Sequence, residues 1–212
     1  MGGDGKAASG QAEVAGSPSG QLESATRAIY LPPFRIDLTI RPGVAVPLPG
    51  RRLAVAVAAA LRAAGAPVPS SVGLVLSDDR ELAELNAEHM GHAGPTDVLS
   101  FPLLAPDAFP RRDPGAGPRS GATPAGIVFA LPPGSRVHLG DIVVSVERAI
   151  AQAEEGRGGQ TSDVRWTAAE ELLLLAVHGA LHVCGWDHAE PAEEAAMRAL
   201  EAHVLADFGV AS

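Results

Sequence analysis

Three histidines lie within eleven residues near the C-terminus, in the segment HGALHVCGWDH (178–188). His178 and His182 are four residues apart, so on an α-helix both rings project from the same face. Gly185 follows, where a left-handed turn can end the helix at little steric cost and return His188 towards the other two rings. Two imidazoles from a helix and a third from the chain after it can bind one divalent ion, and this ligand set predicts Zn²⁺, one per chain.

Three nitrogen ligands leave the fourth position of a tetrahedral zinc ion open, as in catalytic rather than structural sites. Such an ion lowers the pKa of a bound water towards about 7 and polarises a phosphoryl or carbonyl oxygen. The spacing H-x3-H-x2-G-x2-H is also that of the metallopeptidase signature HExxHxxGxxH, but Gly179 stands where that signature has its glutamate base. The spacing therefore predicts the ligands of such a site without the general base of a peptidase.

The other residues of this segment each have two interpretations. Cys184 competes as a ligand, but it lies on a different side of the helix from His182, which favours a small buried apolar role. Trp186 is expected to pack against the core rather than stack on a nucleobase. Asp187 either accepts a hydrogen bond that orients His188 or another ligand, or faces solvent.

Composition favours an ordinary globular protein. The 212 residues suggest one domain, and a hydrophobic fraction of 46% with only 4% aromatics requires a core of Leu, Val and Ala. A net charge of −9 argues against a general nucleic-acid coating protein, although a local basic cleft on an acidic body is compatible with it. One cysteine fits a reducing compartment, and neither a membrane-spanning run nor a signal peptide is found, so we expect a cytoplasmic protein without membrane contact.

The pattern of elements predicts an α/β or α+β fold in which helices cover a small mixed sheet. Residues 1–28 are rich in Gly, Ala and Ser and are expected to form a disordered tail before a single domain at 29–212. Extended segments are predicted at 29–40 (with prolines before the strand), 71–77 and 96–103, and helices at 51–65, 168–184 and 191–209. A further helix is predicted to begin at residue 78, and residues 139–157 are predicted to form a strand that runs into a helix. The histidines thus lie at the end of the most apolar helix.

A long loop rich in Pro, Gly and Arg is predicted within residues 105–137. Its arginines could form a local basic edge that meets RNA, or could simply be solvated; they are Arg111, Arg112, Arg119 and Arg136.

Four segments resemble the YbeY family of zinc-dependent endoribonucleases, also described as rRNA maturation factors. They are HGALHVCGWDH (178–188), PTDVLSFPL (95–103), LGDIVVSVERA (139–149) and the Leu85–Asn86 pair, in the order found in the family. The resemblance implies an α/β domain with zinc held at a catalytic centre by His178, His182 and His188. It further implies cleavage of single-stranded RNA, 3′-end maturation of small-subunit rRNA, and ribosome quality control on ribosomal particles.

The chain departs from the family pattern at one position. A Tyr-Arg pair usually follows Leu85–Asn86, and its arginine is proposed to contact the phosphate, but His89 and Met90 stand there. The candidate substitutes for that cation are His89, His92, Arg111 and Arg112. Thr96, Asp97 and Ser100 resemble the edge of the family's cleft. Asp97 and Asp141 either line the site, where Asp97 could accept a proton or orient a ligand, or make ordinary turn and strand-start hydrogen bonds.

For RNA cleavage, the sequence leaves open whether metal-bound water is the nucleophile or accepts the proton of the 2′-hydroxyl. A non-catalytic, ribosome-associated zinc protein is the main alternative function. A metallopeptidase is less favoured because of Gly179.

Overall fold

A five-stranded mixed sheet forms the centre of the computed structural model, which describes residues 24–110, 132, 135–156, 166–188 and 190–210. Its strands are β1 (Ala25–Leu31), β2 (Phe34–Ile40), β3 (Ser70–Ser77), β4 (Val98–Pro102) and β5 (Val137–Ser145). The helices are α1 (Gly50–Ala63), α2 (Asp79–Leu85), α3 (Val146–Glu155), α4 (Ala168–Val183) and α5 (Pro191–Ala206). This confirms the predicted fold class, and the ends of α1, α4 and α5 lie within one turn of the predicted ones.

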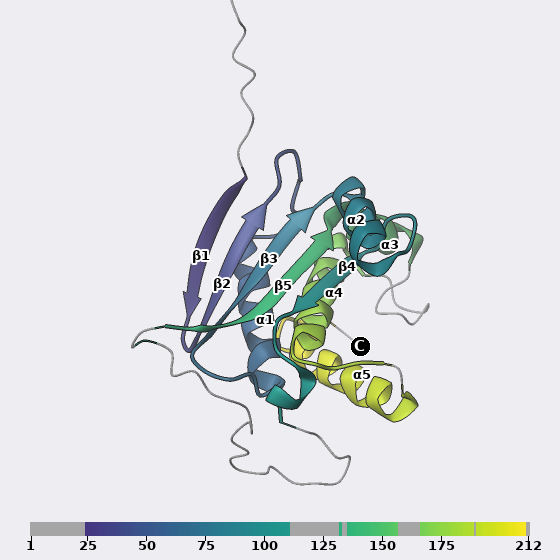
Figure 1. The fold of residues 1–212 in the computed structure, drawn as a ribbon. Helices are drawn as coiled ribbons and strands as arrows, with labels where there is room; N and C mark the ends of the chain where they lie inside the picture. The colour runs from purple at the N-terminus through teal and green to yellow at the C-terminus, as the bar shows by residue number, and fades with distance from the viewer. Residues whose placement is uncertain (1–23, 111–131, 133–134, 157–165, 189, 211–212) are drawn as a thin grey trace, which may run out of the picture.

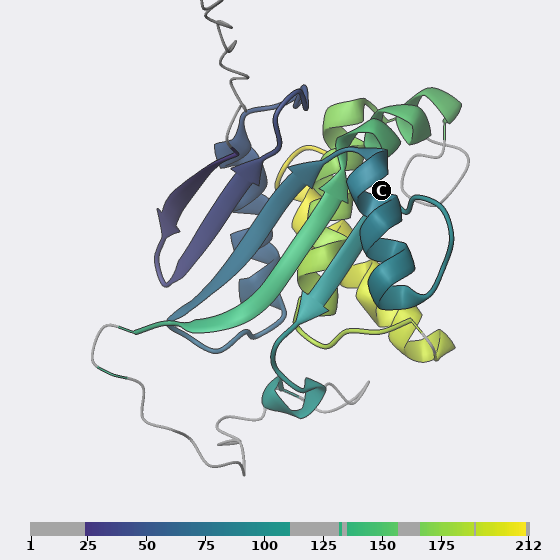
Figure 2. The same ribbon diagram turned by 45° about the horizontal axis from the view of Figure 1, so that its top comes forward.

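The strands are ordered β1-β2-β3-β5-β4 (Figures 1 and 2). β2, β3 and β5 are parallel to their neighbours in this central part of the sheet, whereas β1 and β4 run antiparallel at the two edges. Parallel strands need crossover connections, and α1 supplies the one between β2 and β3.

The N-terminal strand differs from its prediction in two respects. Residues 29–40 form the end of β1 and all of β2, because Pro32 and Pro33 lie in the turn of a hairpin rather than before a single strand. Strand β1 also begins at Ala25, so the predicted boundary of the tail at residue 28 is too late. Residues 25–28 are exposed and gain order by pairing their backbone with 37–40, which apolar content alone does not reveal. Residues 1–23 lie outside the described part of the chain.

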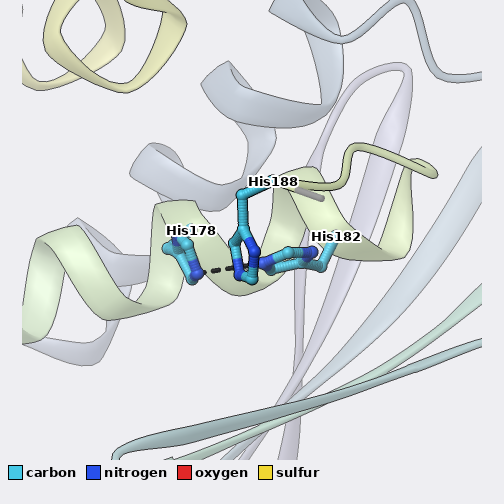
Figure 3. A group of neighbouring side chains, drawn as sticks. All are labelled: His178, His182 and His188. Carbon is cyan, nitrogen blue, oxygen red and sulfur yellow. Dashed lines mark hydrogen bonds between the residues drawn. The ribbon is translucent and has the colours of Figure 1, made fainter. Parts of the chain in front are cut away.

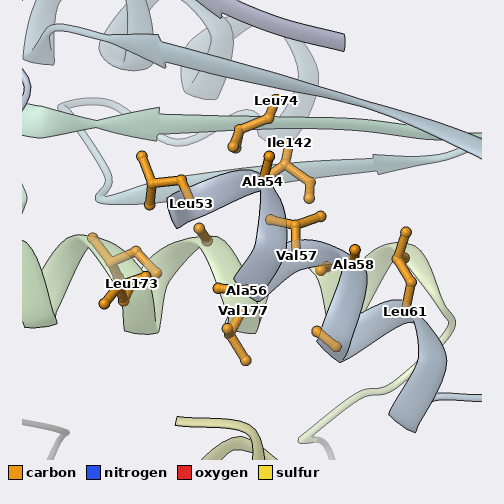
Figure 4. Packing of buried hydrophobic residues seen from close by; sticks show 14 of the residues in the cluster. Leu53, Ala54, Ala56, Val57, Ala58, Leu61, Leu74, Ile142, Leu173 and Val177 are labelled. Atoms are coloured by element: carbon orange, nitrogen blue, oxygen red, sulfur yellow. The ribbon is translucent and has the colours of Figure 1, made fainter. Parts of the chain in front are cut away.

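Helices α1 and α4 pack side by side against one face of the sheet and form the main core with it (Figure 4). α1 contributes mostly small side chains, such as Ala54, Val57 and Ala58, which allow close approach of the helices. α4 is buried on nearly every side, as its uniformly apolar run predicts, and α5 packs against α4 and α1.

The opposite face of the sheet is only partly covered. Leu82 of α2 packs there against Leu99 and Val143, in a second and smaller cluster over β4 and β5. After α2, the chain continues through one π-helical turn, Asn86–Met90, before β4. The other half of this face is polar and includes Arg35, which is paired with Asp37.

The predicted insertion at 105–137 also contains ordered structure. Residues 106–108 form a 3₁₀ turn, Phe109 is buried in the main core, and β5 already begins at Val137. Arg111, Arg112 and Arg119 lie outside the described residues. In the described part of the chain, no helix combines the length and apolar character needed to cross a membrane.

Candidate metal centre

Helix α4 holds two of the three histidines at its C-terminal end. Its first turn is fixed by a reciprocal pair of hydrogen bonds between Thr167 and Glu170, which satisfies backbone N–H groups at the helix start. The helix then contacts α1, α3, α5, β4 and β5. Because its backbone is anchored on all these sides, the directions in which His178 and His182 leave it are fixed by packing.

The helix ends through the glycine turn that the sequence predicts. Gly185 has a φ of 77°, and the Trp186 N–H donates to the Leu181 carbonyl at 3.1 Å, as in a Schellman motif. A side chain at Gly185 would also meet the backbone of Pro106 at 3.0 Å. The turn therefore requires glycine both for its conformation and for its space, and it sends the chain back over the end of α4.

The turn brings His188 to the other two rings (Figure 3). One ring nitrogen from each of the three histidines lies within 4.8 Å of the other two. The His178 and His182 Nε2 atoms are 2.9 Å apart, and the ring centroids of His182 and His188 are separated by 5.2 Å. Within the described ranges this is the one group of His, Cys, Asp or Glu side chains arranged to hold a metal ion.

Hydrogen-bond partners assign the protonated nitrogen of two of these rings. His178 Nδ1 lies 2.6 Å from Glu201 Oε1, and His182 Nδ1 lies 2.8 Å from the Trp186 carbonyl oxygen. A carboxylate and a carbonyl only accept hydrogen bonds, so both Nδ1 atoms donate. Burial, together with the neighbouring His178, lowers the pKa of His182 to about 4, although the Trp186 carbonyl acts in the opposite direction. His182 is therefore neutral at pH 7, with its lone pair on Nε2.

His178 Nε2 then lies 2.9 Å from the lone pair of His182 Nε2, so the two nitrogens can share a proton or, when His178 is also neutral, a metal cation. Zinc–nitrogen bonds of about 2.0–2.1 Å at a tetrahedral angle place two ligand nitrogens roughly 3.4 Å apart, so the rings need only a small adjustment. Neutral imidazole nitrogens are ligands that Zn²⁺ prefers. The residues present fit a zinc ion.

The neighbouring residues Cys184 and Trp186 pack with the core, whereas Asp187 lies at the surface beside His188. Cys184 is buried in the main core and is not part of the metal-binding group. Trp186 is partly buried and packs against that core. Asp187 is exposed, and its Oδ1 accepts a hydrogen bond from the His188 backbone N–H at 2.7 Å and lies 3.9 Å from the ring nitrogen Nδ1 of that residue.

At Gly179, β4 and β5 approach α4 closely. A Cβ atom there would lie 2.5 Å from Ile142 Cγ2 and 3.1 Å from Val98 Cγ2. Ser100 Oγ donates to the Gly179 carbonyl at 3.0 Å, which adds a polar contact between β4 and α4. The helix face that would carry the glutamate of a metallopeptidase is therefore packed against the sheet without room for a side chain.

A small cavity of about 20 Å³ adjoins the histidines on the side of α5. It is lined by His178, His188, Glu194, Met197, Arg198 and Glu201. Sequence reasoning overlooked Glu201, although a carboxylate within the apolar stripe of the last helix is a signal that could have indicated it.

The other predicted residues lie in different surroundings. His89 packs edge-on against Phe101 at 5.3 Å between ring centroids, and Met90 is 43% exposed at the end of the π turn. His92 is exposed, and its backbone N–H donates to the Asn86 carbonyl. The Asp97 carboxylate accepts from Gln152 and from the Val98 backbone, which ties the start of β4 to α3.

Two further candidates lie away from the face on which α4 packs. Ile142 faces α4, so by strand alternation Asp141 faces the other side, where it lies 3.4 Å from His138 Nε2. Arg136 donates to the Pro33 carbonyl at the turn of the β1–β2 hairpin.

The fold and this site define a mixed α/β protein with a three-histidine candidate metal centre on its central helix. The family model described as Endoribonuclease YbeY matches residues 51–209. A protein named Endoribonuclease YbeY from Symbiobacterium thermophilum is 39% identical to this chain over 153 residues, which cover 71% of this chain and 81% of that protein. Another of the same name, from Salinispora tropica, is 41% identical over 139 residues, which cover 66% of this chain and 74% of that protein. A third, in a Roseiflexus species, is 34% identical over 176 residues (82% and 93%). The chain belongs to the YbeY family.

A comparison with solved structures matches a Thermotoga maritima protein studied in solution, with 21% identity, a TM-score of 0.41, and coverage of 82% of this chain and 91% of that one.

The low pKa of His182 predicts a pH dependence of folding in the metal-free protein. The pKa is about 4 in the folded protein and about 6.5 in the unfolded chain, so between these values the unfolded chain binds more protons. The free energy of unfolding should therefore fall as the pH falls from about 6.5 to about 4. Urea denaturation of chelator-treated wild type and His182→Asn should show a steeper fall for the wild type. Parallel curves would contradict the assignment of a neutral, buried His182.

Proposed function

We propose that this protein is a zinc-dependent endoribonuclease of the cytoplasm that cleaves single-stranded RNA. Its proposed role is 3′-end maturation of small-subunit rRNA and ribosome quality control, with ribosomal particles as partners. The observation that carries this proposal is the convergence of three imidazoles, two with their Nε2 atoms 2.9 Å apart, in a chain that belongs to the YbeY family. The relatives named above are described as endoribonucleases, which supports RNA as the substrate.

His178, His182 and His188 would hold the zinc ion. When bound, zinc supplies Lewis acidity towards a phosphoryl oxygen and activates water at neutral pH. The protein's own contribution is to orient the three rings: α4 fixes two of them by packing, and the Gly185 turn delivers the third. His188 is 57% exposed, whereas His178 is 15% exposed, so the centre is open to a substrate on the His188 side.

The metallopeptidase alternative is disfavoured by Gly179, because the sheet occupies the space that a glutamate base would need. The alternative of a non-catalytic, ribosome-associated zinc protein predicts the same metal centre without RNA cleavage. Activity measurements therefore separate the two.

A phosphodiester is an anion, so its binding favours a cation close to the metal. Met90 cannot supply one, and His89, His92, Arg111 and Arg112 are the candidates from the sequence. Arg198 adds a further candidate because it lines the same cavity as His178 and His188. It is paired with Glu194 at 2.6 Å, but the two side chains are 47% and 40% exposed, and pairs open to solvent contribute little to stability. The guanidinium can therefore exchange this carboxylate for a phosphate.

Purified protein is expected to carry about one zinc per chain when chelators are avoided. His178→Ala should lower both the zinc content and the melting temperature, because an ion bound to the native state stabilises it. The exposed His203 on α5 offers a matched control, and His203→Ala should change neither. Metal analysis and thermal denaturation test this; full occupancy with an unchanged melting temperature in His178→Ala would contradict the proposed ligands.

Cleavage of single-stranded RNA is expected of the zinc-loaded wild type and of His203→Ala, whereas His182→Ala should be inactive. Unstructured peptides should not be cleaved by any of the three proteins. If His182→Ala remains folded and associates with ribosomal particles, and the wild type also fails to cut RNA, the non-catalytic alternative is the correct one. Gel assays on labelled RNA and sedimentation with ribosomal subunits distinguish these results.

Arg198→Gln is expected to raise the KM for single-stranded RNA about tenfold, because one charge-assisted contact to phosphate is lost, while zinc content is unchanged. Arg80 forms a comparable exposed pair with Glu84 on α2, at 3.6 Å, and Arg80→Gln is the matched control. Steady-state kinetics at low and high salt measure the effect. Equal KM values for the two variants would remove Arg198 from the candidates.

A further inference from the structure

The buried face of α5 carries one carboxylate among apolar side chains. Glu201 is 6% exposed, and Met197, Val204 and Leu205, which share its face of the helix, are 2–3% exposed. An apolar residue would be expected at this position from the spacing alone. A buried carboxylate is costly unless it is paired and hydrogen-bonded, so its partner defines its role.

That partner is the ring of His178. Glu201 Oε1 lies 2.6 Å from His178 Nδ1, a distance typical of a short, charge-assisted hydrogen bond. The side chain of Glu201 is 8% exposed and that of His178 is 15% exposed, so little water competes for either group. The contact joins α5 to α4 across 23 residues of sequence, and it leaves Nε2 of the same ring free to face His182.

We propose that Glu201 is a positioning residue of the metal centre: it accepts the Nδ1–H of His178, which fixes the tautomer and orientation of the ring and makes Nε2 a stronger ligand. Metal-binding histidines commonly donate their second ring nitrogen to a carboxylate or carbonyl group, with these effects. The proposal rests on the proposed zinc function and specifies which residue outside the three histidines tunes the affinity of the site.

The three histidines differ in the support that they receive. His182 donates to a backbone carbonyl of the turn that follows its own helix, at Trp186. Beside His188 lies the exposed Asp187, whose Oδ1 is 3.9 Å from the ring nitrogen Nδ1. Among the described residues, Glu201 is the buried carboxylate in contact with a histidine of the centre, so it places a negative charge beside the dication where solvent screens it least. Docking of α5 and binding of the ion are therefore coupled.

Zinc affinity of the full-length protein tests this role. Competition with a chromophoric chelator should show affinity about 10–100-fold weaker for Glu201→Leu than for the wild type. Glu201→Gln is nearly isosteric and keeps an acceptor oxygen but no charge, so its affinity should lie between the two. Leu205→Ala is the matched control, because Leu205 is 3% exposed one turn later on the same face. It should lower the melting temperature yet leave the affinity unchanged within about twofold.

A second measurement needs neither zinc nor activity. In the metal-free protein, ¹⁵N NMR of the imidazole nitrogens should show His178 with its proton on Nδ1, and Glu201→Leu should lose this fixed tautomer while Leu205→Ala retains it. The proposal would be overturned if Glu201→Gln and Leu205→Ala weakened zinc binding equally, or if Glu201→Leu left the tautomer of His178 unchanged. Either result would show that the carboxylate serves packing only.

The two proposals fail in different ways. If the wild type binds no zinc, the proposed metal function is refuted. If the wild type binds zinc and cuts RNA, and both Glu201 variants bind zinc with the affinity of the wild type, only the role of Glu201 is refuted.

Discussion

The packing of helix α4 against strands β4 and β5 is the constraint on which the candidate site depends. At Gly179 the helix and the sheet approach so closely that not even a methyl group fits, and Ser100 bonds to the helix backbone at the same place. The residue before Gly179 is His178 and the residue three positions after it is His182, so this close contact also holds the backbone from which both rings project. The backbone at both positions is part of a close-packed interior, which resists small displacements.

Hydrogen bonding then decides what these rings can do. A histidine side chain offers either nitrogen to a metal, and the choice depends on which one donates a proton to a neighbour. Here a carboxylate from α5 and a carbonyl from the turn after α4 each engage an Nδ1 atom, so the two Nε2 atoms converge. Partial burial keeps His182 uncharged at neutral pH. A site prepared in this way favours a cation, and the open side at His188 leaves access for a substrate.

The same arrangement separates this chain from peptidases that share the spacing of their histidines. Peptidase chemistry of that type needs a base one residue after the first ligand, and the packing of α4 on the sheet removes the space for it. The acidic body, with a net charge of −9, does not attract RNA by its overall field. Under the proposed function, binding of RNA would depend on the zinc ion and on a few local cations, so the identity of the residue that takes the place of the family's arginine matters for this protein.

The sequence by itself determined the fold class, the apolar helix 168–184, its end at Gly185 and the three histidines, because helical periodicity and the conformational freedom of glycine are local properties. It misjudged the strand at 29–40, since the hairpin depends on pairing between β1 and β2 rather than on composition. Only the tertiary structure decided that Glu201 meets His178, that Asp141 faces the other side of the sheet, and that Gly179 is enclosed. These are contacts between elements distant in the chain, and their geometry depends on how helices and strands pack, which no local pattern encodes.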